Sequence, residues 1–269
     1  MKNIYLIDVE TTDEILTKLI SRIPKNYRTL IAKKVKPYFI KEATFGDSAL
    51  IFNYTTTYRN AITQMHLQGC NVFPSYDLSE LCRNRIKCTK FIEDLSRCYI
   101  EREYYHSHYN EFVKFEPGWV YKLGNCHQGI NKYIHTDIGR NLWNEEYIKE
   151  RFIEGRSFRV LLIGSFVFVI EHTNSNTWIK NINPDEEIVY TDPLNQLSND
   201  FNIYKMISDA EYIKRHCVRN GLVSPTFGFD YVANNKDICL LEMNDMCGLP
   251  DNKDIINAYV EESCKLLKI

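Results

Sequence analysis

The first 75 residues alternate between short apolar runs and segments in which apolar residues recur at helical spacing. Residues 4–9 (IYLIDV) form the first apolar run, and residues 11–23 (TTDEILTKLISRI) and 57–70 have helical spacing, the second ending at Gly69. Further strand candidates are residues 29–41, 47–55 and 71–74. Strands that alternate with helices usually lie parallel in one sheet. The sequence therefore predicts an α/β domain with a parallel sheet, running to about residue 80.

The rest of the chain has a different pattern, in which strands adjoin strands. Residues 77–98 read as a helical stretch, in one piece or broken in two, and residues 144–155 (NEEYIKERFIEG) contain a predicted helix that runs into an apolar segment. Two more predicted helices cover residues 192–217 and 254–269. The strand candidates are residues 111–115 and 118–122, the antiparallel pair 156–164 and 165–172, and the hairpin 227–234 and 237–245. This half of the chain is predicted to be α+β.

Composition excludes several classes of protein. With 44% hydrophobic and 25% charged residues, the 269-residue chain is predicted to be globular, and its formal net charge of -2 offers no general affinity for nucleic acid or anionic lipid. The longest apolar run, residues 160–170, falls short of the roughly 20 residues that a membrane span requires and is interrupted by Gly164 and Ser165. We expect no nucleic-acid partner, no membrane span and no signal peptide.

Cysteine usage indicates a reducing compartment. Nine cysteines are scattered along the chain without a C-x-x-C pair, and several lie within apolar helical or strand patterns. Free buried thiols explain this better than a disulfide or zinc framework. We therefore expect a cytoplasmic protein.

The predicted hairpin near the C-terminus carries acids in an apolar setting. Asp230 lies on its first strand, and Glu242 and Asn244 lie two residues apart on its second, so that their side chains share one face. Two carboxylates and an amide oxygen on a rigid sheet suit Mg²⁺ (or Mn²⁺) bound to polyphosphate. The alternative is a solvent-exposed hairpin with its acids on the wet face, although the neighbours of Glu242 in LLEMN are apolar.

A second segment, residues 119–133 (WVYKLGNCHQGINKY), begins as a strand that ends at Lys122. Nine residues with two glycines follow before Lys132. They could simply join two strands, in which case Lys122 is a solvated strand end. They could also form a loop whose backbone N–H groups cover phosphates.

Taken together, these segments resemble a known family. VYK, NCHQGINK, ERFIEG, SFRVLLIG, TWIKN, GFDYV and LLEMN follow one another in the order found in ATP-grasp proteins of the RimK-like, glutathione-synthetase-like and synapsin-like kinds. The resemblance begins near residue 70. It implies an ATP-grasp fold with an N-terminal pre-ATP-grasp α/β domain at residues 1–80 and an ATP-grasp domain at residues 81–269. The latter would comprise a lid at about 97–153 and a C-terminal ATP-binding subdomain at about 154–269.

The resemblance also implies a nucleotide site. Lys122 would contact the α- and β-phosphates, and Arg85 would supply a second phosphate contact, unless it is only a charge on a helix surface. The loop would close over the β- and γ-phosphates with His127, Gln128 and Gly129. The segment ERFIEG would hold the adenine and ribose through Glu150, which would accept from the adenine amino group, and through Arg151, Phe152, Ile153 and Glu154.

The remaining implied residues concern catalysis and the metal. Arg159 corresponds to a basic residue that is common on the strand after ERFIEG and is assigned to catalysis. Lys180 and Asn181, also assigned to catalysis, correspond to the basic and amide pair near the γ-phosphate and second metal. Asp230, Glu242 and Asn244 correspond to the metal ligands. One departure stands out. Where an arginine that stabilises an acyl phosphate is common, this chain has Glu171, followed by His172.

The family resemblance leaves three functions open. The first is an ATP- and Mg²⁺-dependent carboxylate–amine ligase that joins a small-molecule or peptide carboxylate to an amine through an acyl phosphate. The second is a small-molecule kinase similar to inositol-phosphate kinases. The third is a synapsin-like ATP-binding protein without ligase activity, which the Glu171 departure would suit. Homodimers are usual in the family.

Overall fold

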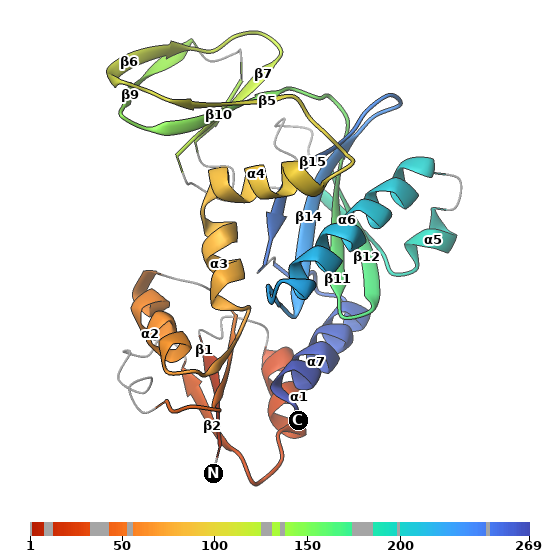
Figure 1. Ribbon diagram of the computed structural model, residues 1–269. Coiled ribbons are helices and arrows are strands. Elements are labelled where there is room, and N and C mark those ends of the chain that lie inside the picture. Colours follow the sequence, from red (N-terminus) through yellow and green to blue (C-terminus); the bar gives the residue numbers. More distant parts are fainter. Residues whose placement is uncertain are drawn as a thin grey trace.

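The computed structural model describes residues 2–7, 13–32, 43–52, 56–124, 131–134, 138–173, 185–197, 200–245 and 248–269. Its elements form an N-terminal parallel sheet, a central antiparallel sheet and a smaller lid of two sheets (Figure 1). None of the helices within these ranges is both long and apolar enough to cross a membrane.

The N-terminal sheet has the strand order β2-β1-β3-β4, and every described pair is parallel. Its strands and helices are β1 (Asn3–Ile7), α1 (Asp13–Arg22), β2 (Arg28–Ala32), β3 (Ser48–Ile51), α2 (Thr56–Leu67) and β4 (Asn71–Phe73). The predicted parallel α/β arrangement is confirmed. A parallel sheet is usually buried on both faces, and β1 meets this condition. Ile4 and Leu6 on one of its faces lie in one core cluster, and Tyr5 and Ile7 on the other face lie in another.

The central sheet has the strand order β13-β12-β11-β14-β15, with antiparallel pairing throughout. Both predicted hairpins of this half are confirmed. The strands are β11 (Arg156–Ile163), β12 (Phe166–Thr173), β13 (Glu186–Tyr190), β14 (Thr226–Ala233) and β15 (Ile238–Asn244).

Helices α3 (Tyr76–Arg83), α4 (Arg85–Leu95) and α6 (Phe201–Arg219) cover one face of the central sheet. The short helix α5 (Pro193–Gln196) comes directly before α6 in the chain. The predicted stretch 77–98 is broken in two at Asn84, whose side chain caps α4 by accepting from the backbone N–H of Lys87. Leu78 and Cys82 of α3 belong to the core of the central sheet. We therefore propose that the domain boundary lies before α3 rather than at residue 80.

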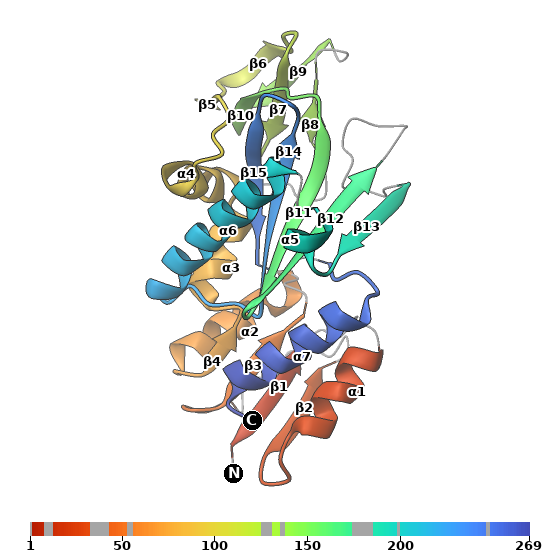
Figure 2. The ribbon, with the colours of Figure 1, turned by 90° about the vertical axis from the view of Figure 1, so that its right-hand side faces the viewer.

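The C-terminal helix α7 (Lys253–Leu267) joins the first sheet to the central one. Its buried Ile256 and Val260 share one core cluster with Leu6 and Leu19 of the N-terminal unit and with Leu161 of β11. Figure 2 shows α7 beside α1, below the central sheet. The two units therefore share part of their core.

The lid contains two antiparallel sheets, β5-β10-β7-β8 and β6-β9. Their strands are β5 (Arg102–His106), β6 (Tyr109–Lys114), β7 (Trp119–Leu123), β8 (Lys132–Tyr133), β9 (Gly139–Trp143) and β10 (Glu146–Arg151). The prediction of a helix within residues 144–155 is wrong, because β10 is a strand paired on both sides, with β5 and with β7. Tyr147 stacks on Tyr105 of β5, a contact between strands that helical periodicity cannot reveal.

Candidate functional site

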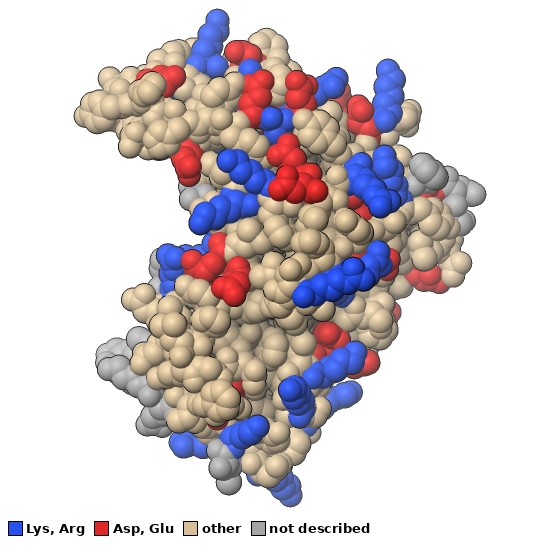
Figure 3. All heavy atoms as spheres, in the orientation of Figure 1, with Lys and Arg blue, Asp and Glu red and all other residues tan. Residues whose placement is uncertain are grey.

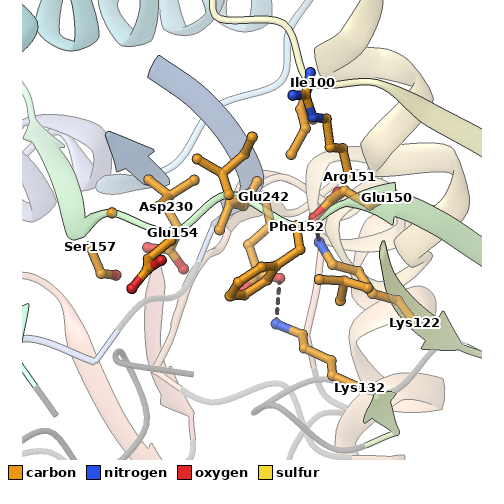
Figure 4. Close-up of a pocket in the computed structure, with 15 residues that line it drawn as sticks. Ile100, Lys122, Lys132, Glu150, Arg151, Phe152, Glu154, Ser157, Asp230 and Glu242 are labelled. Atoms are coloured by element: carbon orange, nitrogen blue, oxygen red, sulfur yellow. Dashed lines mark hydrogen bonds and ion pairs between the residues drawn. The ribbon is translucent and has the colours of Figure 1, made fainter. Parts of the chain in front are cut away.

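A pocket of about 300 Å³ lies between the lid and the central sheet (Figure 4). Its wall combines the segment that links β10 to β11 with residues of β7, β8, β14 and β15. The apolar part of the lining consists of Ile100, Val120, Phe152, Ile153, Val232 and Leu241, and the charged part includes Lys122, Lys132, Glu150, Asp230 and Glu242. The pocket can therefore accept a ligand that has both an apolar part and a strongly charged part.

The acids of the C-terminal hairpin meet on the pocket side of the central sheet. Asp230 of β14 lies directly opposite Glu242 of β15, and a bulge follows, because Tyr231 pairs with Leu240. The Nδ2 atom of Asn244 lies 3.4 Å from Oδ2 of Asp230. The structure thus brings together the three predicted metal ligands. Among the described residues, no group of three or more His, Cys, Asp or Glu side chains is arranged to hold a metal ion.

Both acids have basic partners. Arg159 of β11 donates from Nε to Oδ1 of Asp230 at 2.7 Å and from Nη2 to Oδ2 at 3.0 Å. Nζ of Lys132 lies 3.4 Å from Oε2 of Glu242, a side chain that is 28% exposed. The charge of Lys132 holds the pKa of Glu242 below its ordinary value, although burial opposes this. The Glu242 carboxylate is therefore ionised at neutral pH.

A buried ion cluster supports the other side of the pocket. Glu150 accepts from Nζ of Lys122 at 2.8 Å and from Nε of Arg102 at 2.7 Å, and all three side chains are almost fully buried. Burial lowers the pKa of Lys122 to about 8, against the opposing charge of Glu150. Burial would raise the pKa of Glu150, but Lys122 and Arg102 outweigh it and the pKa is lowered. The cluster orients Lys122 without leaving its charge unpaired.

The linking segment, residues 151–155, is held at both ends by hydrogen bonds. The N–H of Phe152 donates to the carbonyl of Gly118 at 2.8 Å, and Nδ2 of Asn234 donates to the carbonyl of Glu154 at 3.0 Å. A Cβ atom on Gly155 would lie 2.4 Å from the carbonyl oxygen of Ala233, so the close approach of the segment to β14 requires a glycine. The ring of Phe152 lies at the centre of the pocket wall in Figure 4.

Comparison with known proteins finds likeness in structure alone. No family model matches the chain, and no curated protein matches its sequence. D-alanine–D-alanine ligase from Bacillus anthracis is similar in structure, with a TM-score of 0.60, 13% identity, and coverage of 100% of this chain and 99% of that one.

Two further solved structures are also similar to this chain. The ATP-grasp ligase PsnB complexed with a minimal precursor has a TM-score of 0.55 at 10% identity, covering 98% and 99% of the two chains. A RimK domain ATP-grasp protein from Sphaerobacter thermophilus has a TM-score of 0.59 at 9% identity, covering 99% and 100%. The chain has the ATP-grasp fold. The first ligase is also matched in complex with ATP, and PsnB in complex with Mg and ADP.

Several predicted ATP-grasp residues lie outside the described residues, namely His127, Gln128, Gly129, Lys180 and Asn181. The strands on either side of the first group, β7 and β8, pair antiparallel, with Lys122 opposite Lys132. The two strands therefore form a hairpin, while the phosphate-covering role of the loop stays a prediction.

Sequence reasoning missed Lys132 as a member of the site. Because the residues opposite each other in an antiparallel pair share one face, Lys132 lies on the same face as Lys122 and lines the pocket. The two lysines that bracket the loop were the available signal. Arg102 was missed as well, and no local pattern around it indicates its partner Glu150.

The structure excludes one of the two sequence-based interpretations of Arg85, that of a charge on a helix surface. Only 6% of this first residue of α4 is exposed, so it is not a helix-surface charge. Its Nη1 atom donates to the carbonyl oxygens of Leu123 at 3.2 Å and Gly124 at 3.3 Å, where β7 enters the loop. Arg85 thus supports the strand that carries Lys122, and its contact with a phosphate stays a prediction.

Glu171, which stands where an arginine is common in the family, lies on the face of the central sheet away from the pocket. Glu171 is opposite Phe158, a residue of the core beneath α6, and accepts from Nε and Nη2 of Arg156 at 2.7 and 2.8 Å. The next residue, His172, is opposite Ser157, which lines the pocket. Of these two neighbours on β12, His172 is therefore the one on the pocket face of the sheet. Burial lowers the pKa of its imidazole.

Proposed function

We propose that the protein is an ATP- and Mg²⁺-dependent carboxylate–amine ligase that acts through an acyl phosphate. The observation that carries this proposal is the pocket itself, in which an apolar wall from the linking segment continues into paired lysines and paired acids. The ATP-grasp fold and its occurrence in the compared ligases support the same reading.

In this proposal the adenine lies against Phe152 and Val232, and the ribose lies near Glu154 and Ser157. Those two side chains are on one side of the pocket in Figure 4, and the two lysines are on the other. Glu150 would meet the adenine amino group while it also holds Lys122. The triphosphate would extend along Lys122 and Lys132, where charge-assisted hydrogen bonds are available.

The hairpin fits a magnesium ion in the chemistry of its donors. Asp230 and Glu242 supply hard carboxylate oxygens from directly opposite strand positions, and Asn244 adds a neutral amide. Bound there with nucleotide, Mg²⁺ or Mn²⁺ would neutralise phosphate charge. Asp230 and Glu242 would therefore hold the metal, and Arg159, which is bonded to Asp230, would contact the same phosphates.

The proposed reaction has two steps. A carboxylate oxygen of the acceptor attacks the γ-phosphorus, the bond to the β-phosphate oxygen breaks, and ADP leaves. An amine then attacks the acyl carbon, inorganic phosphate leaves with the bonding electrons, and the amine nitrogen loses a proton. Lys122, Lys132 and Arg159 would contribute by holding the phosphates in line and stabilising their charge. The acceptor would be a small-molecule or peptide carboxylate.

A synapsin-like ATP-binding protein is the second candidate. The observation that favours it is the imidazole of His172 on the pocket face of β12. Unlike an arginine, a histidine with a lowered pKa carries no permanent positive charge with which to stabilise an acyl phosphate. A cytoplasmic location suits both candidates, since the seven cysteines within the described residues are free and buried.

Phosphate release from Mg-ATP tests the proposal. The protein is incubated with pools of amino acids and short peptides, with and without amines, and hydroxylamine is added in parallel to trap an acyl phosphate. A ligase releases phosphate only with a carboxylate acceptor and yields a hydroxamate. Tight Mg-ATP binding without release in any pool would favour the second candidate, and a lack of binding would contradict both.

A further inference from the structure

Two cations of the site are bonded to the two carboxylates that the proposed function assigns to the metal. Arg159 holds both oxygens of Asp230, at 2.7 and 3.0 Å. Lys132 reaches Glu242 at 3.4 Å from the opposite side of the pocket, as the dashed line in Figure 4 shows. The same atoms would have to change partners for a nucleotide and its metal to bind.

These ion pairs meet an electrostatic need of the protein without ligand. Asp230 and Glu242 are directly opposite on paired strands, a position in which like charges destabilise a sheet. Asp230 is almost fully buried, so an unpaired charge there would be costly. Arg159 and Lys132 neutralise one acid each and thus stand in for the metal.

Binding of metal alone or of ATP alone would upset this balance. A divalent ion on Asp230 and Glu242 would displace Arg159 and Lys132 and would leave four positive charges beside only two negative ones. ATP without metal brings its negative phosphates beside two carboxylates. With both bound, the metal would pair with the carboxylates and the phosphates with the two cations, so that neither the acids nor the cations would be left without an opposite charge.

We propose that Arg159 and Lys132 exchange partners, neutralising Asp230 and Glu242 in the free protein and moving to the phosphates when Mg-ATP enters. The site then accepts divalent metal and triphosphate together and binds either alone weakly. This inference rests on the proposed nucleotide site.

Mn²⁺ binding to the nucleotide-free protein provides the test, since free Mn²⁺ is measured directly by electron paramagnetic resonance. Wild type, Arg159→Gln and Lys132→Met are compared with Arg156→Gln. Arg156 is a matched control because it lies on the same strand, bonded to Glu171 on the face away from the pocket. Circular dichroism and thermal unfolding verify that each variant is folded, and Arg159→Lys serves as a milder second variant.

The two variants should bind Mn²⁺ alone about tenfold more tightly than wild type, because a competing charge-assisted partner of the carboxylate is gone. The same variants should bind Mn-ATP about tenfold more weakly, since a phosphate partner is lost. The control should change neither. Wild type should show at least about tenfold tighter Mn²⁺ binding when ATP is present, and ATP affinity should rise by the same factor with Mn²⁺.

Opposite changes in the two affinities distinguish partner exchange from simple damage to the site. If Mn-ATP binds wild type, and the variants bind Mn²⁺ alone no more tightly than wild type, the inference is wrong and the proposed function stands. If wild type binds no Mn-ATP, the proposed function fails and the inference with it.

Discussion

Lys122 and Glu150 form a buried ion pair, Nζ to Oε1 at 2.8 Å, that connects the charged end of the pocket to the segment between the lid and the central sheet. Lys122 lies on β7 and Glu150 on β10, two neighbouring strands of the lid sheet. Arg102 of β5 bonds the other carboxylate oxygen. One carboxylate therefore ties together three strands, and this relationship leads to the first prediction.

Glu150→Gln should destabilise the protein by about 3–5 kcal/mol, because two buried cations would lose their common counterion. Urea unfolding measures the change. Glu103→Gln is the matched control, since Glu103 lies on the lid strand β5, is 41% exposed and pairs with Lys149 at 3.6 Å. It should cost no more than about 1 kcal/mol. An equal loss of unfolding free energy in the two variants would show that the buried cluster stabilises the protein no more than an exposed ion pair does.

A pH dependence follows from the lowered pKa of Lys122. Burial brings the pKa to about 8 in the folded protein, against 10.5 for an ordinary lysine. Between pH 8 and 10.5 the unfolded chain holds this proton and the folded protein does not, so this group makes the free energy of unfolding rise with pH. The rise amounts to at most about 1.4 kcal/mol per pH unit.

Lys122→Met removes this titration, and the difference between wild type and variant cancels the contributions of other groups. The stability of wild type relative to Lys122→Met should therefore increase from pH 8 to 10.5 and stay constant from pH 6 to 7. A difference that is flat over the whole range would mean that Lys122 keeps its ordinary pKa.

What the sequence could predict depends on how local the determining contacts are. The hairpin of β14 and β15 follows from adjacent residues, so the meeting of Asp230 with Glu242 was predictable. The lid strand β10 was not, because Lys149 has charge partners at helical spacing in the sequence but pairs with Glu116 at 2.9 Å across the lid.

Dependence on contacts between distant parts of the chain also explains which features of the site the sequence did not predict. Which face of β12 meets the pocket is set by its register with β11, and a shift of one residue exchanges Glu171 for His172. Arg102 and Glu150 are 48 residues apart, and the pairing of β5 with β10 brings them together. Basic and acidic side chains are interspersed over the face in Figure 3, and neither sign of charge gathers there into one patch.

Gly155→Ala should destabilise the protein by about 1–3 kcal/mol and weaken Mg-ATP binding. The new methyl group would lie 2.4 Å from the backbone oxygen of Ala233, so the linking segment and β14 would have to separate. Gly248→Ala is the control, because no atom lies within 4 Å of the added Cβ. Urea unfolding and calorimetric titration with Mg-ATP measure the two effects. Unchanged stability and affinity would show that the segment tolerates the methyl group.

Glu242→Gln should leave the fold intact and weaken Mg²⁺-dependent nucleotide binding by about tenfold or more, since a charged ligand is replaced by a neutral one. If the protein is a ligase, turnover should fall further than affinity, because the metal stabilises charge that develops in the transition state. Glu211→Gln on the outside of α6 is the control. A Glu242→Gln variant that binds Mg-ATP as tightly as wild type would mean that the hairpin is not the metal site.

The last prediction separates the two neighbouring residues of β12. Glu171→Gln should lower stability by about 1–3 kcal/mol, because Glu171 is only 11% exposed and would lose its charge-assisted pair with Arg156. It should leave Mg-ATP affinity within about twofold of wild type, a change below ~0.5 kcal/mol. His172→Ala should weaken Mg-ATP binding severalfold, because it removes a buried ring from the sheet face that carries Arg159 and Asp230. Calorimetric titration measures both affinities. If Glu171→Gln reduced affinity as much as His172→Ala does, the assignment of the two side chains to opposite faces would be wrong, and the acid at position 171 would act on the site after all.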